Sequence, residues 1–155
     1  MDLKSQLKIL IDDAPNHGLS TVVIEQAIAP VLEILGKQLG HLEYYILQNL
    51  SDEWIVYHFD NQEQQQAPKK VIYAFSSAQD ADDFQEAEES SNILAVPLPI
   101  THILFRLFSL TSIDSMIFFT EPGNFNTAIE LNRNDLQNLI QQQLTQLVNL
   151  PDDIA

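Results

Sequence analysis

Apolar residues recur with helical spacing in the first forty positions. A short helix is predicted over residues 2–13, because one apolar stripe is formed by Leu3, Leu7, Leu10 and Ile11. A second helix is predicted from a cap at position 20 or 21 to Gly40, with a kink or break at Pro30, which lacks a backbone donor. Its apolar residues cover most of its circumference, so we expect either full burial against the sheet and other helices or a homodimer formed through it.

Further along the chain the pattern becomes typical of strands. Aromatic and β-branched residues dominate six segments, which predict strands over residues 42–48, 54–59, 70–75, 93–98, 112–120 and 127–131. Shorter helices are predicted over residues 78–87 and 101–110, and a longer helix closes the pattern near residue 148. Residues 121–124 predict a type II turn, with a positive φ at Gly123.

This order of elements, ααβββαβαββα, predicts an α+β fold. One domain over residues 1–155 is expected, with a helical pair in residues 1–40 and a sheet with its helices in residues 42–148. All six strands should belong to one mostly antiparallel or mixed sheet that the helices cover. The length of 155 residues is sufficient for a full hydrophobic core.

Charge and composition narrow the classes of function. The chain has 22 acidic and seven basic residues, a net charge of −15, and no cysteine. Direct binding to nucleic acid or to an anionic membrane requires a cationic patch, and the one adjacent basic pair is Lys69-Lys70. We therefore expect the chain to bind neither nucleic acid nor a membrane directly. Without cysteine there is neither a disulfide nor a thiolate metal site. Because the first residues do not form a signal peptide, we expect a cytoplasmic protein.

Catalytic and metal-binding patterns are weak. The four glycines form no phosphate-binding loop, and His58 with Asp60 supplies only two metal ligands on one strand face. The Ser76-Ser77 pair precedes a helix without the glycines of a nucleophile elbow, so a helix cap is the better interpretation. Asp114 is expected to accept a hydrogen bond from a backbone amide or from Arg106. Because no convergent catalytic set is recognisable, a non-enzymatic protein is favoured over a third class, an enzyme with an unrecognised site, and neither cofactor nor metal is predicted.

The helix predicted over residues 78–87 carries the best candidate for a binding surface. Acidic residues crowd its exposed side, and the stretch from Asp80 to Glu89 contains no base. The proposed partner-binding face consists of Asp80, Asp82, Asp83 and Glu86. Such a run of charge is either a solvated face or a docking surface for a positively charged protein.

Two segments of the chain resemble the N-terminal domain of the SseB (enhanced serine sensitivity) family. Residues 71–84, VIYAFSSAQDADDF, are similar to its strand followed by an acidic helix. Residues 113–124, IDSMIFFTEPGN, with the strand and leucine-rich helix after them, are similar to the ending of that domain. The N-terminal helices and hairpin also resemble those of small uncharacterised cyanobacterial proteins of this type. The resemblance implies an α+β sheet domain with no established catalytic residues.

Two functional hypotheses follow from the sequence. The first is a non-catalytic interaction or adaptor module that binds a protein partner. The alternative is a small-ligand-binding domain with a pocket between the sheet and the helices. A deep pocket lined by several polar groups would favour the alternative, whereas a flat sheet face or an exposed apolar helix would favour the adaptor.

Overall fold

The computed structural model describes residues 1–18, 20–59, 68–86 and 92–148, and its elements follow the predicted order. The helices are α1 (Leu3–Asp12), the 3₁₀ turn η1 (Ala14–His17), α2 (Thr21–Val23), the π-helical segment η2 (Ile24–Ile28), α3 (Ala29–Leu39), α4 (Ala78–Glu86), α5 (Ile100–Ser109) and α6 (Arg133–Val148). The strands are β1 (Glu43–Gln48), β2 (Tyr57–Phe59), β3 (Lys69–Phe75), β4 (Leu94–Pro99), β5 (Ser115–Phe119) and β6 (Ala128–Asn132). The α+β class is confirmed. No helix in the described residues is both long and apolar enough to cross a bilayer.

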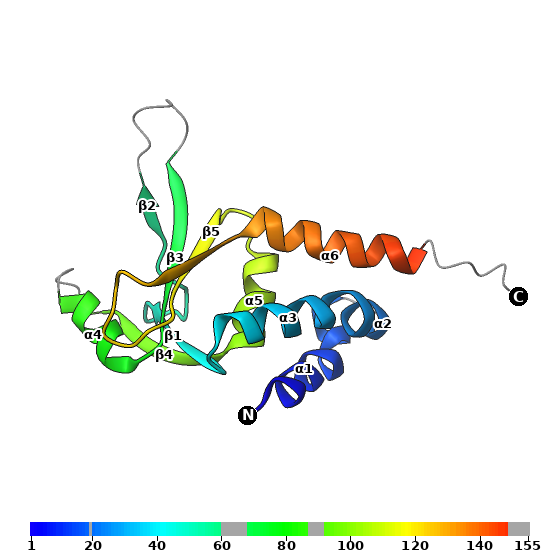
Figure 1. The fold of residues 1–155 in the computed structure, drawn as a ribbon, viewed down its shortest axis with the longest axis horizontal. Coiled ribbons are helices and arrows are strands. Elements are labelled where there is room, and N and C mark those ends of the chain that lie inside the picture. The colour runs from blue at the N-terminus through cyan, green and yellow to red at the C-terminus, as the bar shows by residue number, and fades with distance from the viewer. Residues whose placement is uncertain (19, 60–67, 87–91, 149–155) are drawn as a thin grey trace, which may run out of the picture.

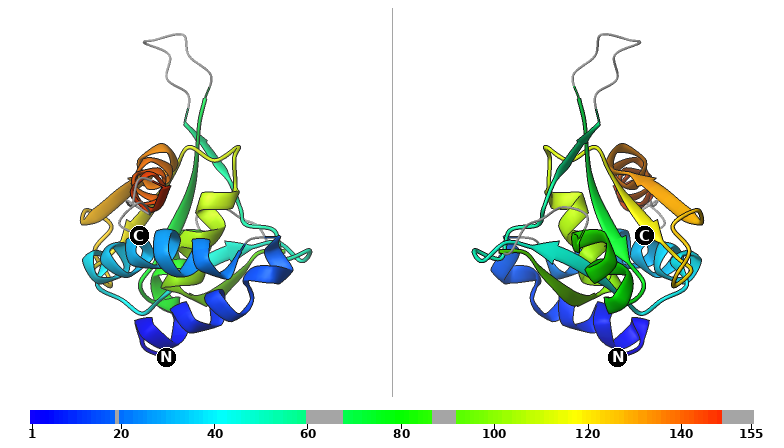
Figure 2. Two further views of the ribbon diagram at one scale, coloured as in Figure 1. Left: turned by 90° about the vertical axis from the view of Figure 1, so that its right-hand side faces the viewer. Right: turned by 90° about the vertical axis from the view of Figure 1, so that its left-hand side faces the viewer.

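The six described strands form one mixed sheet, as predicted. Five of them lie in the order β4-β1-β3-β5-β6, and β2 pairs with the beginning of β3. The β3–β5 pair is parallel, whereas the other pairs between described strands are antiparallel. In both views the β2–β3 hairpin projects from the body of the protein (Figures 1 and 2).

The second predicted strand is shorter than expected. Residues 54–59 were predicted as one strand, but only Tyr57–Phe59 pairs continuously with a neighbour. Trp54 forms a single bridge to Gln48 at the end of β1, and β2 then pairs with β3 instead. The intervening residues cross from one strand to the next, which prevents a continuous ladder.

Helices cover the two faces of the sheet unequally. Helices α1, α3, α5 and α6 lie on one side and α4 on the other (Figure 1). The larger core joins sheet residues such as Tyr44 and Phe118 to helical residues such as Leu32 and Leu104, all of them fully buried. Beneath α4 the core is smaller and aromatic, and Phe75 stacks on Phe119 with ring centroids 5.4 Å apart.

The expected break at Pro30 takes the form of a widened helical turn. Proline has no backbone N–H and its ring disturbs the preceding turn, which is the ordinary cause of such a distortion. Here η2 precedes it, and the N–H of Ala29 donates to the carbonyl of Ile24, five residues back. Most apolar residues of η2 and α3 are buried, but Ile34 of α3 is 59% exposed, and Val22 of α2, a segment without a buried residue, is 56% exposed. Burial is therefore nearly complete, and a homodimer through this helix stays a prediction.

Candidate functional site

Only part of the acidic face predicted on α4 is exposed to solvent. Asp82 and Asp83 are exposed, and Gln79 donates to Asp83 one helical turn later. Asp80 is only 3% exposed, so it does not share their surface. The side chain of Glu86 lies outside the described residues. The docking role of this face stays a prediction, and Asp80 no longer belongs to the predicted surface.

Asp80 connects α4 to the turn between β5 and β6. Its two carboxylate oxygens accept the N–H of Gly123 at 2.9 and 3.1 Å. Gly123 has φ +78°, as the predicted type II turn requires, and Asn124 donates to the carbonyl of Glu121 across it. Ser77 caps the helix by accepting the N–H of Asp80 at 3.1 Å. The expected helix cap is therefore present at Ser77, while the carboxylate of Asp80 stabilises a distant turn.

Ser76 borders a cavity of about 560 Å³ that does not contain a catalytic triad. The cavity is lined by Met1, Gln6, Gly40, His41, Leu42, Glu43, Ser76 and Pro99. The hydroxyl of Ser76 is buried and makes no hydrogen bond. His41 Nε2 instead donates to the carbonyl of Thr120 at 2.6 Å, so the imidazole does not activate the serine. The predicted structural role of the Ser76-Ser77 pair fits this arrangement.

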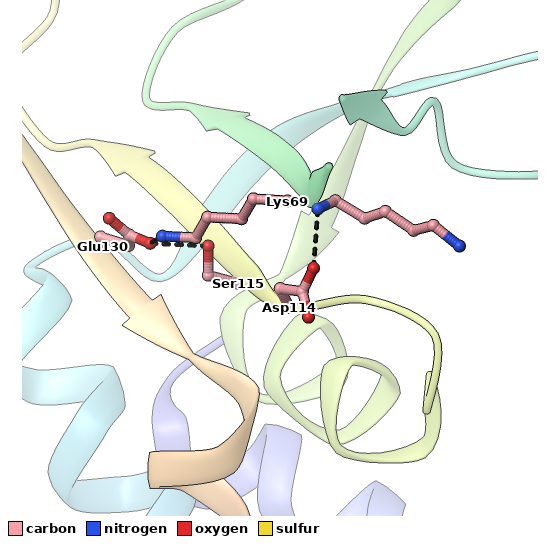
Figure 3. A network of polar contacts seen from close by, with 5 residues as sticks. Lys69, Asp114, Ser115 and Glu130 are labelled. Carbon is pink, nitrogen blue, oxygen red and sulfur yellow. Dashed lines mark hydrogen bonds and ion pairs between the residues drawn. The ribbon is translucent and has the colours of Figure 1, made fainter. Parts of the chain in front are cut away.

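Polar contacts at one end of the sheet hold three strands together (Figure 3). The carboxylate of Glu130 on β6 accepts the hydroxyl of Ser115 on β5 at 2.8 Å and forms an ion pair with Lys69 on β3. The hydrogen bond from Lys69 lowers the pKa of Glu130. Asp114 accepts the backbone N–H of Lys70 at 2.8 Å, which is one of its two predicted roles. Ser115 is completely buried, so this cluster stabilises the sheet and offers no nucleophile to a substrate.

Metal binding finds no support in the described part of the chain. No group of three or more histidine, aspartate or glutamate side chains there is close enough to hold an ion. His58 is exposed on β2, and its proposed companion Asp60 lies outside the described residues.

A second cavity, here called the Trp54 cavity, lies between the sheet and the helices α1 and α5. Its volume of about 470 Å³ is within the roughly 300–1,000 Å³ typical of small-molecule sites. The wall is formed by Ile9, Leu10 and Asp13 of the first helix and its cap, Gln48, Asp52 and Trp54 around the β1 turn, Val96 and Leu98 of β4, and His102, Phe105 and Arg106 of α5. It has the position and the polar lining that the sequence-based alternative required.

Regular spacing within each element explains why these side chains meet. His102, Phe105 and Arg106 are three and four residues apart, so they share one face of α5. Val96 and Leu98 are two residues apart on β4, so their side chains point to the same face of the sheet. Trp54 is bridged to Gln48 across an antiparallel turn, which places both side chains on the same face.

The turn that carries Asp52 is fixed by its own hydrogen bonds. The side-chain oxygen of Asn49 accepts the N–H groups of Ser51 and Glu53, and the N–H of Asp52 donates to the carbonyl of Asn49. Asp52 has φ +63°, a left-handed conformation that aspartate tolerates better than most residues. The turn therefore reverses the chain and places Trp54 beside Gln48, at the wall of the cavity.

Gln48 is the unusual residue of this cavity. The residue is only 9% exposed, and its carboxamide makes no hydrogen bond within the described structure, although its polar atoms still reach solvent at the cavity. A buried amide ordinarily has partners, because leaving its donors and acceptor unsatisfied is costly. Gln6, the other buried glutamine, follows that rule: it donates to the carbonyls of Met1 and Leu42 and accepts both the N–H and the hydroxyl of Thr101.

Arg106 supplies a positive charge at the exposed side of the cavity. Its guanidinium carbon lies 5.2 Å from the centre of the Trp54 ring, which is a cation–π distance. The guanidinium has no hydrogen-bond or carboxylate partner in the described residues. Arg133, the other arginine, donates to the carbonyl of Phe108 at 2.8 Å and to Gln137 at 3.2 Å, and so supports the fold.

Comparisons with known proteins leave the family of this chain undetermined. No protein-family model matches the sequence, and no curated protein is significantly similar to it. The resemblance to SseB N-terminal domains stays a prediction, and the function is argued from the geometry of the site alone.

Proposed function

We propose that this chain is a non-catalytic domain that binds a small organic molecule in the Trp54 cavity. The observation that carries the proposal is Gln48, which is 9% exposed and whose carboxamide faces a cavity of mixed apolar and polar lining without a partner in the described residues. A ligand would supply the missing hydrogen bonds and would cover the apolar wall around them.

Binding is favoured over catalysis by the kinds of side chain present. The described residues that line the cavity include no serine, threonine, cysteine or lysine, and its acids Asp13 and Asp52 lie on a helix cap and an exposed turn. They do include aromatic and aliphatic surface from Trp54, Phe105 and Leu10, which provides contact area for a ligand body. This supports the pocket hypothesis over the adaptor hypothesis, since the α4 surface offers charge alone.

Trp54 makes the proposal directly testable, because it is the one tryptophan of the chain. Its fluorescence therefore reports on this cavity and on no other site. Titration with hydrocinnamyl alcohol, a neutral probe with a phenylpropyl body, should give a saturable change.

The Gln48→Met variant should weaken binding of this alcohol roughly two- to tenfold, the equivalent of one neutral hydrogen bond. Gln141→Met, on an exposed position of α6, is the matched control and should leave the affinity unchanged. The absence of a saturable signal in the wild-type protein, or equal affinity in the Gln48→Met variant, would contradict the proposal.

A further inference from the structure

We infer that the ligand of the Trp54 cavity is a monocarboxylate with an apolar body, whose carboxylate is bound by Arg106. This inference rests on the proposed function and specifies its ligand. The body would lie against Trp54 and the apolar wall, with Gln48 available to a further polar group of the ligand.

The state of Arg106 is the first support. In a chain with 22 acids and seven bases, an arginine would be expected to find a carboxylate partner easily. Arg106 has none in the described structure, and its guanidinium instead lies over the Trp54 ring. This cation–π contact uses none of the N–H donors of the guanidinium, and those donors match a carboxylate with two parallel hydrogen bonds.

The charges around the cavity restrict the anion. Asp13 and Asp52 also line it, and among the described lining residues Arg106 is the one permanently charged cation. A doubly charged phosphate would meet these two carboxylates with a single full positive charge to offset them. A singly charged carboxylate is repelled less by these two acids than a phosphate is, and the charge of one arginine balances it.

The nearby acids are placed so that they compete weakly with such a ligand. The carboxylate of Asp13 already accepts the side-chain amide of Asn16 at 2.5 Å. Asp52 is exposed on its turn, where solvent and salt screen its charge. If these acids nevertheless dominate, the cavity would prefer an amine, and this alternative is one outcome of the test.

Three probes with the same phenylpropyl body separate the possibilities: hydrocinnamate, hydrocinnamyl alcohol and hydrocinnamylamine. Each is titrated against the wild-type protein at low salt, with Trp54 fluorescence as the signal. We expect hydrocinnamate to bind at least about tenfold more tightly than the alcohol, the range of a charge-assisted hydrogen bond. The amine should bind more weakly than either.

Two variants assign the preference to Arg106. Arg106→Gln should abolish the advantage of the carboxylate over the alcohol, and Arg106→Lys should retain only part of it, because lysine lacks the planar pair of donors. Arg106 is exposed, so these variants should fold normally. Lys37→Gln, which removes the same charge from an exposed ion pair on α3, should retain the full preference.

The outcomes distinguish this inference from the proposed function. If the alcohol or the amine binds as tightly as hydrocinnamate, or if Arg106→Gln leaves the carboxylate affinity unchanged, the inference is overturned while ligand binding stands. If none of the three probes produces a saturable change, both are overturned.

Discussion

Gln48 and Gln6 provide a paired test of whether a buried amide serves the fold or a ligand. Both glutamines are buried, at 9% and 2% exposure, and methionine has a similar length and volume. Replacing each with methionine removes the amide without creating a large cavity. The two variants differ in the hydrogen bonds that are lost, which are four for Gln6 and none for Gln48.

The expected magnitudes follow from that difference. Each hydrogen bond contributes a net ~0.5–1.5 kcal/mol, and Gln6→Met also leaves the buried N–H and hydroxyl of Thr101 without their acceptor, so a loss of about 2–4 kcal/mol is expected. Gln48→Met breaks no protein hydrogen bond and removes an amide whose polar atoms reach only solvent. Its free energy of unfolding should be unchanged or higher by up to ~1 kcal/mol.

Urea-induced unfolding, followed by far-ultraviolet circular dichroism, measures both effects. The slope of the free energy against urea should be the same in the two variants, so that the midpoints report stability alone. If Gln48→Met is destabilised as strongly as Gln6→Met, Gln48 has a structural role. Gln48 would then no longer support ligand binding in the Trp54 cavity.

Three further predictions concern other features of the fold. Asp80→Ala should cost about 1–3 kcal/mol in urea unfolding, because it leaves a turn amide without its acceptor, whereas Asp82→Ala should stay within about 0.5 kcal/mol. Tyr44 donates to the carbonyl of Leu39, and burial raises its pKa to about 12. The unfolded chain loses this proton near pH ~10, so the stabilisation present below that pH declines between pH ~10 and ~12. Tyr44→Phe should cost about 1 kcal/mol at neutral pH and remove this part of the decline, and an identical decline in both proteins would refute the assignment. Replacing Asp82 and Asp83 with asparagine should slow association with a lysine-rich peptide at low salt, and an unchanged rate would identify them as solvated surface.

The sequence predicted the sheet because the alternation of apolar residues is a local signal. The six strands and the turn at Gly123 follow from period and turn chemistry, and all are present. The strand predicted over residues 54–59 is longer than the observed one. The sequence does not reveal that the chain leaves β1 after Trp54 and continues beside β3. Which neighbour a strand chooses depends on distant segments.

The candidate site was harder to predict than the fold. The run of acids on α4 suggested one surface, but the buried position of Asp80 depends on a turn more than forty residues away. The Trp54 cavity joins four separate segments, so no local motif marks it. His102, Phe105 and Arg106 at helical spacing offered a partial signal, and a buried glutamine without partners is visible only once the fold is known.

A crystal structure of the protein in the presence of hydrocinnamate tests the central claim most directly. Our account predicts the phenyl group against Trp54 in the cavity between α1, α5 and the sheet, with the carboxylate about 2.7–3.2 Å from the nitrogens of Arg106. A probe bound elsewhere on the surface, with this cavity empty, would contradict it.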